Sequence, residues 1–177
     1  MHTTLNKIRA HEPCTDGWKK LLKHLGKTEA DDEPLNIKTI LESNGLEDAL
    51  WCLQAVEDKD KEIRLFAVWC ARQVQHLMAD QRSLDALDVA ERFANGLASE
   101  EELRDAGDAA LAASRAASRG AALAASRAAS RAARADGDAA NAAALSAAWA
   151  AGDAAGDAAQ AATKEAQAKK LIEICED

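Results

Sequence analysis

The chain has few of the residues that build sheets and sharp turns. Among its 177 residues there are no tyrosines, two prolines, two phenylalanines and nine glycines. Alanine, which has the best intrinsic helix propensity, takes the place of β-branched and aromatic side chains. The composition therefore predicts an almost entirely α-helical protein, and the length is enough to bury a continuous core without metal or disulfide links.

Motifs for catalysis and for cofactor binding are also missing. No phosphate-binding loop, zinc pattern or calcium loop is present, and the four cysteines include no C-x-x-C pair. Cys52 and Cys70 lie inside apolar stretches, where a thiol behaves as a small buried hydrophobe. We therefore expect a non-enzymatic protein without a cofactor or metal, in a reducing compartment.

No charged-then-apolar leader and no apolar run of about 20 residues are found, which argues against secretion and membrane spanning. The net charge of −8 discourages binding to the phosphate backbones of nucleic acids. We expect a cytoplasmic protein, with neither a membrane nor a nucleic acid as its partner.

Helical signals divide the chain into three segments. Residues 1–33 are expected to form a short helix, capped by Asp16 and closed by Gly26, followed by a charged linker. Residues 34–98 are expected to form an amphipathic helical core, and residues 99–177 an alanine-rich helical hairpin.

In the core segment, Pro34 suits the first turn of a helix that stops at Gly45. The phrase Ala-Leu-Trp-Cys-Leu at 49–53 returns as Ala-Val-Trp-Cys-Ala at 67–71. The polar run at 57–62 between them indicates a turn, so the two phrases are expected on the arms of an αα-hairpin.

A further amphipathic helix is expected between residues 80 and 96. Ser99 with Glu102 forms a capping box, which places the start of a long helix at Glu100. From there to Ala135 only two glycines interrupt the helical pattern, each at a cost of about 1 kcal/mol.

The tail repeats a four-residue phrase, first with arginines and then with aspartates. Charge and bulk are mirrored about Asp136, pairing Arg115 with Asp157, Arg119 with Asp153, Arg134 with Asp138, and Leu123 with Trp149. The mirror predicts an all-α bundle of about six helices ending in a long antiparallel alanine-rich hairpin. Exposed ion pairs contribute little energy, so the charges would chiefly set the register.

The tail arginines have two other interpretations. Arg115, Arg119, Arg127 and Arg131 would form a strip that binds an anionic ligand, because arginine forks suit phosphate and carboxylate. In the other interpretation these arginines bind no ligand and only form the solvated faces of the helices. Residues four apart drift by about 40° per step around a helix, so a compact anion pocket would need a second helix.

Outside the tail, one group of polar side chains stands out. His76, Arg72 and Asp80 are expected on roughly one side of a helix, and Arg82 follows just beyond them. No nucleophile pattern accompanies the histidine. The group is either structural capping or a contact site.

The stretch from Arg64 to Ala117 resembles the bacterial immunity protein family with an alanine-rich C-terminus, found among polymorphic-toxin immunity genes and in phage homologues. The matching motifs are Cys70-Ala71-Arg72-Gln73-Val74, Asp80-Gln81-Arg82, Ala86 through Gly96, and Ser99-Glu100-Glu101. The resemblance implies a helical protein that neutralises a toxin or other effector by stoichiometric binding.

Under this interpretation the acidic surface would occlude the partner's active site, and complementary charge would speed association. The expected contact residues are Arg64, Arg72, His76, Asp80 and Arg82. The alternative is a phage counter-defence protein that inhibits a host defence enzyme or sequesters an anionic signalling molecule. Exchange of the hairpin between two copies would give a homodimer.

Overall fold

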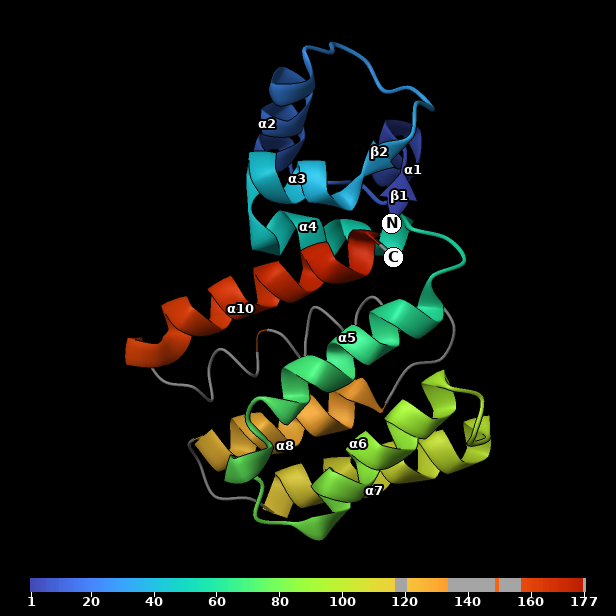
Figure 1. The fold of residues 1–177 in the computed structure, drawn as a ribbon, viewed down its shortest axis with the longest axis vertical. Coiled ribbons are helices and arrows are strands. Elements are labelled where there is room, and N and C mark those ends of the chain that lie inside the picture. The colour runs from blue at the N-terminus through green and yellow to red at the C-terminus, as the bar shows by residue number, and fades with distance from the viewer. Residues whose placement is uncertain (117–120, 134–148, 150–156, 177) are drawn as a thin grey trace. The chain divides into compact units, whose positions relative to one another are not determined.

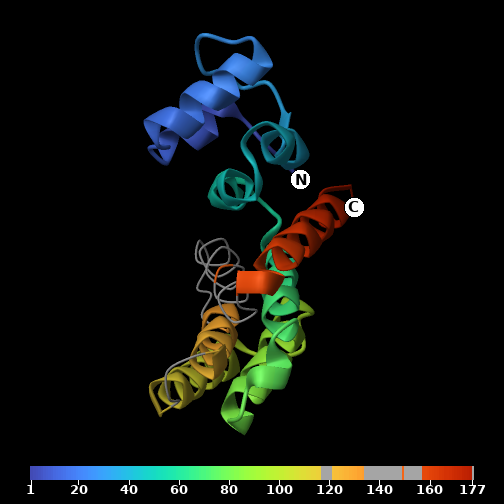
Figure 2. The same ribbon diagram turned by 90° about the vertical axis from the view of Figure 1, so that its left-hand side faces the viewer.

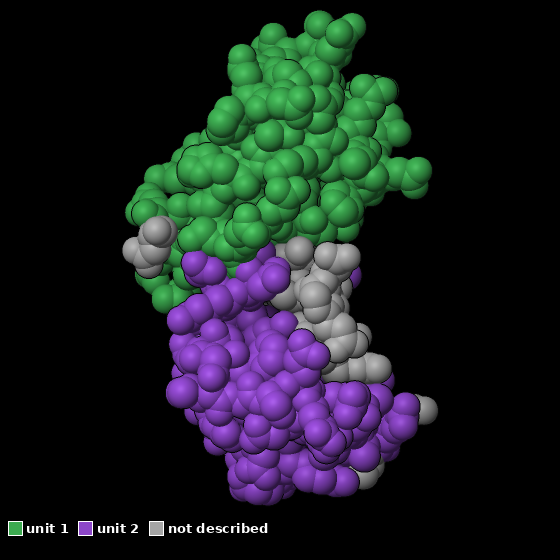
Figure 3. All heavy atoms as spheres, turned by 90° about the vertical axis from the view of Figure 1, so that its right-hand side faces the viewer, with its two compact units in different colours: residues 1–59, 168–177 green, residues 60–167 purple. Residues whose placement is uncertain are grey.

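The computed structural model describes residues 1–116, 121–133, 149 and 157–176. Within these ranges the chain is mostly helical, with nine α-helices, two 3₁₀ helices and one two-stranded sheet (Figure 1). The all-α class is confirmed, and the helices outnumber the six expected because several are short. The chain forms two compact units, residues 1–59 with 168–177 and residues 60–167, coloured separately in Figure 3.

The first unit contains the sheet and the shorter helices. In chain order its elements are β1 (His2–Thr3), α1 (Leu5–Ala10), α2 (Thr15–Leu25), β2 (Leu35–Asn36), α3 (Ile37–Asn44), α4 (Leu46–Cys52), the 3₁₀ helix η1 (Leu53–Ala55) and the end of α10 (Asp157–Glu176). The strands pair antiparallel, with His2 opposite Asn36 and Thr3 opposite Leu35.

The start of α2 differs from the sequence prediction. Cys14 is the N-cap, and its Sγ accepts the Gly17 N–H at 3.4 Å, while Asp16 lies in the first turn. A carboxylate there still favours the helix, because it faces the positive end of the helix dipole. The end is as predicted, with Gly26 in the left-handed conformation at φ 67°.

The next helix also begins later than expected. Pro34 precedes β2 and does not open the helix, which starts at Ile37 after the N-cap Asn36. Strand pairing with β1 uses the residues that a Pro34 start would have placed in the first turn. The helix stops at Gly45 as predicted, and the φ of 100° at this residue is a backbone conformation that favours glycine.

An apolar core and a few polar ties hold this unit together. The buried side chains include Leu5, Ile8, Leu21, Ile37, Ile40, Leu50, Leu53, Leu171 and Cys175. The last two come from α10, whose final turn is also held by the Met1 ammonium, which donates to the Cys175 carbonyl at 2.7 Å. Lys38 pairs with Glu176 at 3.0 Å, on the same turn.

The second unit is built from longer helices. They are α5 (Asp60–Arg72), the 3₁₀ helix η2 (Gln75–Leu77), α6 (Gln81–Ala94), α7 (Glu100–Ala116), α8 (Ala121–Ala132) and the beginning of α10. Trp69 and Cys70 belong here, whereas Trp51 and Cys52 belong to the first unit. Both of these cysteines are buried free thiols, as predicted.

The boundaries of α6 and the start of α7 confirm the sequence analysis. Asp80 caps α6 by accepting the Arg82 N–H. The capping box is present: the Glu102 carboxylate accepts the Ser99 N–H at 2.8 Å, and the Ser99 hydroxyl accepts the Glu102 N–H at 3.1 Å. The helix starts at Glu100 as expected.

The expected continuous helix from Glu100 to Ala135 is wrong. The structure has two helices there, α7 and α8, which pack against each other and lie side by side in Figures 1 and 2. Helix α8 also packs against α5 and α6. A single long helix would have left this alanine face in water, whereas the folded-back arrangement buries it.

Helix α8 is a core helix made of small residues. Among its described side chains the buried ones are Ala125, Ser126, Ala128, Ala129, Ser130 and Ala132. Small side chains allow neighbouring helices to approach closely, which replaces bulky packing by tight packing. The mirror that predicts the hairpin involves Arg119, Arg134, Asp136, Asp138 and Asp153, which lie outside the described residues, and the side chain of Asp157, which is also not described.

Candidate functional site

The five predicted contact residues lie in the second unit but in different environments. Arg64 is 4% exposed on α5, and its guanidinium lies 4.8 Å from the centre of the Phe93 ring on α6. This cation–π contact joins two helices of the core. Arg64 therefore contributes to the packing of α5 on α6.

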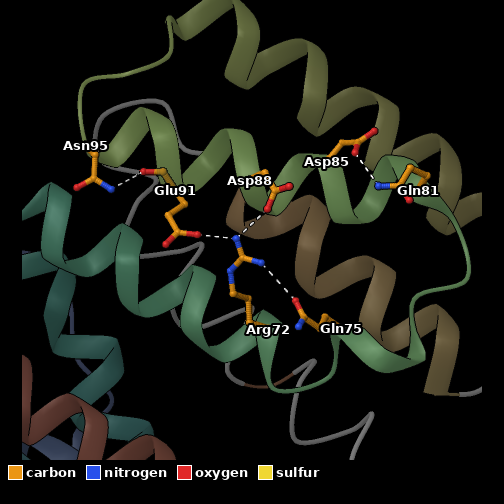
Figure 4. A network of polar contacts seen from close by, with 7 residues as sticks. All are labelled: Arg72, Gln75, Gln81, Asp85, Asp88, Glu91 and Asn95. Carbon is orange, nitrogen blue, oxygen red and sulfur yellow. Dashed lines mark hydrogen bonds and ion pairs between the residues drawn. The ribbon is translucent and has the colours of Figure 1, made fainter.

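Arg72 lies at the end of α5 and links it to α6 (Figure 4). One of its nitrogens, Nη2, donates to Asp88 at 2.9 Å and to Glu91 at 2.5 Å, and Nη1 donates to Gln75 at 3.3 Å. Burial lowers the pKa of Arg72, but the two carboxylates outweigh this and raise it. The guanidinium is thus a fixed charge whose donors are largely engaged.

The carboxylates that face Arg72 belong to a group that sequence reasoning missed. Asp85, Asp88 and Glu91 follow one another at intervals of three residues on α6, and we call them the α6 acidic face. Gln81 holds Asp85 with a hydrogen bond of 2.8 Å, as Figure 4 shows. The three-residue spacing can be seen in the sequence, but the pairing of Asp88 and Glu91 with Arg72 can be seen only in the folded structure.

The α6 acidic face is accessible. Asp88 is 65% exposed and Glu91 47% exposed, although both contact Arg72. Arg92, the residue after Glu91, donates to the Leu97 carbonyl at 2.9 Å and to Glu102 at 3.3 Å, and neither of these partners belongs to the α6 acidic face. The carboxylates are therefore held in place on one side and open to solvent on the other.

Asp80 and Arg82 pair with each other at the start of α6. Oδ1 of Asp80 accepts Nε of Arg82 at 2.9 Å, and Oδ2 accepts Nη2 at 2.7 Å. The side-chain and backbone hydrogen bonds from Arg82 lower the pKa of Asp80 to about 2. Because the guanidinium is fixed but still exposed, it is preorganised for a further contact.

His76 lies apart from that pair. It is exposed in η2, on the wall of a cavity of about 380 Å³. The residues lining the cavity are Gln73, Val74, His76, Leu77, Ala162, Thr163 and Ala166. The structure therefore separates the predicted constellation into a buried cation, a clamp at Arg72, an ion pair and a histidine at a cavity.

The expected arginine strip is described only in part. Arg115 is exposed on α7 and Arg127 is exposed on α8. These residues lie on two helices, so they do not form a strip along one helix. Arg119 and the side chain of Arg131 lie outside the described residues.

The described residues offer no group of three or more histidine, cysteine and acidic side chains placed to hold a metal ion. In the same ranges no helix is long and apolar enough to cross a membrane. Comparison of the chain with protein-family models, with curated proteins and with solved structures found no match.

Proposed function

We propose that the protein acts by stoichiometric binding to a protein partner, as an immunity protein does towards a toxin. The α6 acidic face is the observation that carries the proposal. Two of its carboxylates are fixed by Arg72 and remain exposed by about half or more, at 65% and 47%. Such a surface matches a partner with a basic patch, for example around the active site of a toxin that acts on an anionic substrate.

Electrostatics supports this choice of partner. The chain has a net charge of −8, and a surface of one sign steers an oppositely charged protein towards it and raises the association rate. The carboxylates already have fixed positions, so binding costs less side-chain entropy. In this proposal no reaction is catalysed, and inhibition results from covering the partner's site.

The edge of the proposed interface lies at the start of α6. Arg82 is held by Asp80 and remains 46% exposed, so it is available to an acidic or carbonyl group of the partner. His76 precedes Arg82 closely in the sequence, and it is also exposed. Arg64 and Arg72 support the interface by fixing α5 to α6, and are positioning residues.

A second candidate is counter-defence, either by inhibiting a host defence enzyme or by sequestering an anionic signalling molecule. The exposed guanidinium groups of Arg115 and Arg127 favour it, since arginine suits phosphate. Mass spectrometry of small molecules extracted from the protein purified from its host separates the two candidates. A bound nucleotide-like anion without a protein partner supports sequestration.

The binding proposal is tested by capture of partners from the lysate of the native host. The tagged protein is compared with the double variant Asp85→Asn with Asp88→Asn. The matched control is Glu12→Gln with Glu29→Gln, which removes two exposed charges from the first unit. One protein recovered in equal amount by wild type and control, and depleted with the α6 variant, supports the proposal. Equal recovery by all three overturns it.

A further inference from the structure

The tripeptide Asn-Gly-Leu occurs at residues 44–46, at the end of α3, and again at residues 95–97, at the end of α6. Both glycines have a positive φ, 100° at Gly45 and 71° at Gly96. Because glycine has no side chain, its backbone nitrogen can approach the amide carbon of the preceding asparagine closely. Both asparagines are therefore candidates for deamidation, the loss of the side-chain amide as ammonia, and their matching local sequences make them equal in the unfolded chain.

The hydrogen bonds of the folded structure hold back this reaction at both positions. The N–H of Gly45 donates to the Leu41 carbonyl at 3.0 Å, and the N–H of Gly96 donates to the Phe93 carbonyl at 2.9 Å. Each nitrogen must be released before it can attack. The rate at each asparagine therefore follows the fraction of molecules in which that turn is open, and this fraction differs between parts of one structure.

Asn44 is held by tertiary contacts. It is half-buried, and its Nδ2 donates to the Gly17 carbonyl at 2.8 Å and to Oδ2 of Asp48 at 2.7 Å. Its Oδ1 accepts the Ser43 hydroxyl at 2.8 Å. The bond to Gly17 joins α3 to α2, and the bond to Asp48 joins α3 to α4. Release of this turn therefore requires helices of the first unit to separate.

Asn95 is held by its own helix. Its side chain is exposed, and its Nδ2 donates to the Glu91 carbonyl at 2.9 Å, one turn back on α6 (Figure 4). Leu97 donates its N–H to the Arg92 carbonyl at 2.8 Å, but its side chain is 68% exposed and adds little apolar burial to the turn. Release of this turn involves the last turn of α6, and helix ends fray at little cost in free energy.

We propose that Asn95 is a site of spontaneous deamidation, with water as the reactant, and that the fold protects Asn44 from the same reaction. The modification places a slow change of charge and of backbone at the end of α6, beside Glu91. The two sites share the sequence Asn-Gly-Leu, so the difference between them comes from the structure around each one. The inference is independent of the proposed function.

The atoms balance with one water. The backbone nitrogen of Gly96 attacks Cγ of Asn95, and a succinimide ring forms. The bond from Cγ to Nδ2 breaks, and ammonia leaves with the proton of the Gly96 nitrogen. Water then adds to one of the two ring carbonyls and opens the ring. Aspartate results when the bond from the ring nitrogen to Cγ breaks, and isoaspartate results when the bond to the backbone carbonyl carbon breaks.

The products fit the turn less well than asparagine does. The new carboxylate lies four residues from Glu91 and at the negative end of the helix dipole, and both features disfavour it. It also lacks the amide hydrogens that Asn95 donates to the Glu91 carbonyl. Isoaspartate further routes the backbone through the side chain, which changes the spacing between the Phe93 carbonyl and the Gly96 N–H. Deamidated protein is therefore expected to unfold at a lower urea concentration.

The test incubates purified full-length protein in alkaline buffer made with water labelled with heavy oxygen, and maps the peptides by mass spectrometry. The label marks the residues that were deamidated during the incubation. Conversion to aspartate and isoaspartate is expected to be at least about tenfold faster at Asn95 than at Asn44, because a helix end opens more often than a tertiary contact. In denaturing urea the two rates are expected to become similar.

Asp48→Ala removes one tie of Asn44. Once circular dichroism has shown that the variant is folded, it is expected to raise the rate at Asn44 and to leave the rate at Asn95 unchanged. Equal rates at the two asparagines of the folded wild type, faster conversion at Asn44, or no conversion at Asn95 would each overturn the proposal. A difference that persists in urea would originate in the local sequence and would overturn it as well.

Discussion

Nη2 of Arg72 lies 2.5 Å from a carboxylate oxygen of Glu91, which joins the end of α5 to the third turn of α6. The same nitrogen reaches Asp88 at 2.9 Å, so one guanidinium group holds two carboxylates in place. This clamp connects the packing of the second unit with the exposed surface of the proposed interface. A substitution of Arg72 is therefore expected to change the stability of the protein first, and any change in binding has to be interpreted after the stability is known.

Arg72→Ala is expected to lower the free energy of unfolding by about 1 kcal/mol, because it leaves two neighbouring carboxylates without their cation. Urea unfolding followed by circular dichroism measures the loss, and 1 M salt should reduce it. Arg104→Ala, at an exposed position on α7, is the control and should be close to neutral. Equal effects of the two substitutions would contradict the clamp.

The Asp80–Arg82 pair should give a pH dependence. The folded pKa of Asp80 is lowered to about 2 from 3.8, so the stabilisation is complete above about pH 4 and is lost as the pH falls towards 2. Asp80→Asn removes this titration but keeps a residue suited to the N-cap. The stability difference between wild type and Asp80→Asn should shrink over that window, and a difference constant from pH 5 to pH 2 would contradict the pairing.

Helix α8 should tolerate little extra volume. Ala129 is fully buried, so Ala129→Leu forces neighbouring side chains apart and should cost about 1–3 kcal/mol. Ala112→Leu adds the same atoms at an exposed position of α7 and should be nearly neutral. Thermal unfolding of the two variants compares them directly, and similar midpoints would show that α8 is not a core helix.

Much of the second unit could be predicted from local signals. The Asp80 cap, the Ser99–Glu102 capping box and the glycine stops depend on neighbouring residues only, so the sequence contains all the information they need. The folding back of α8 on α7 could not be predicted in this way. Alanine favours one long helix as much as two short ones, and only tertiary burial of α8 decides between them.

The candidate site was predictable only in part. The sequence indicated Arg72, Asp80 and Arg82 as one group. In the structure Asp80 and Arg82 pair with each other within one turn, whereas Arg72 pairs with a carboxylate on the neighbouring helix α6. Arg64 gave no sign of its burial over Phe93, because a cation in an amphipathic helix is ordinarily solvated. The α6 acidic face could be recognised as a candidate site only from the fold, which places Arg72 beside two of its carboxylates.

Ser83 provides a test of packing at the inner side of α6. Its hydroxyl is fully buried and has no hydrogen-bond partner among the described residues. Ser83→Ala should therefore leave stability unchanged or raise it by up to about 1 kcal/mol. Thr3→Val removes a buried hydroxyl that donates to the Ala55 carbonyl and should instead cost about 1 kcal/mol. Chemical denaturation measures both, and a clear loss in Ser83→Ala would contradict the assignment.

The central claim is one-to-one binding through the α6 acidic face, and calorimetric titration of the purified partner into the protein tests it most directly. The account predicts saturation at one partner per chain, with weaker binding by Asp85→Asn with Asp88→Asn and unchanged binding by Glu12→Gln with Glu29→Gln. Saturation at the same affinity for all three proteins, or chemical conversion of the partner by substoichiometric amounts of this protein, would contradict the account.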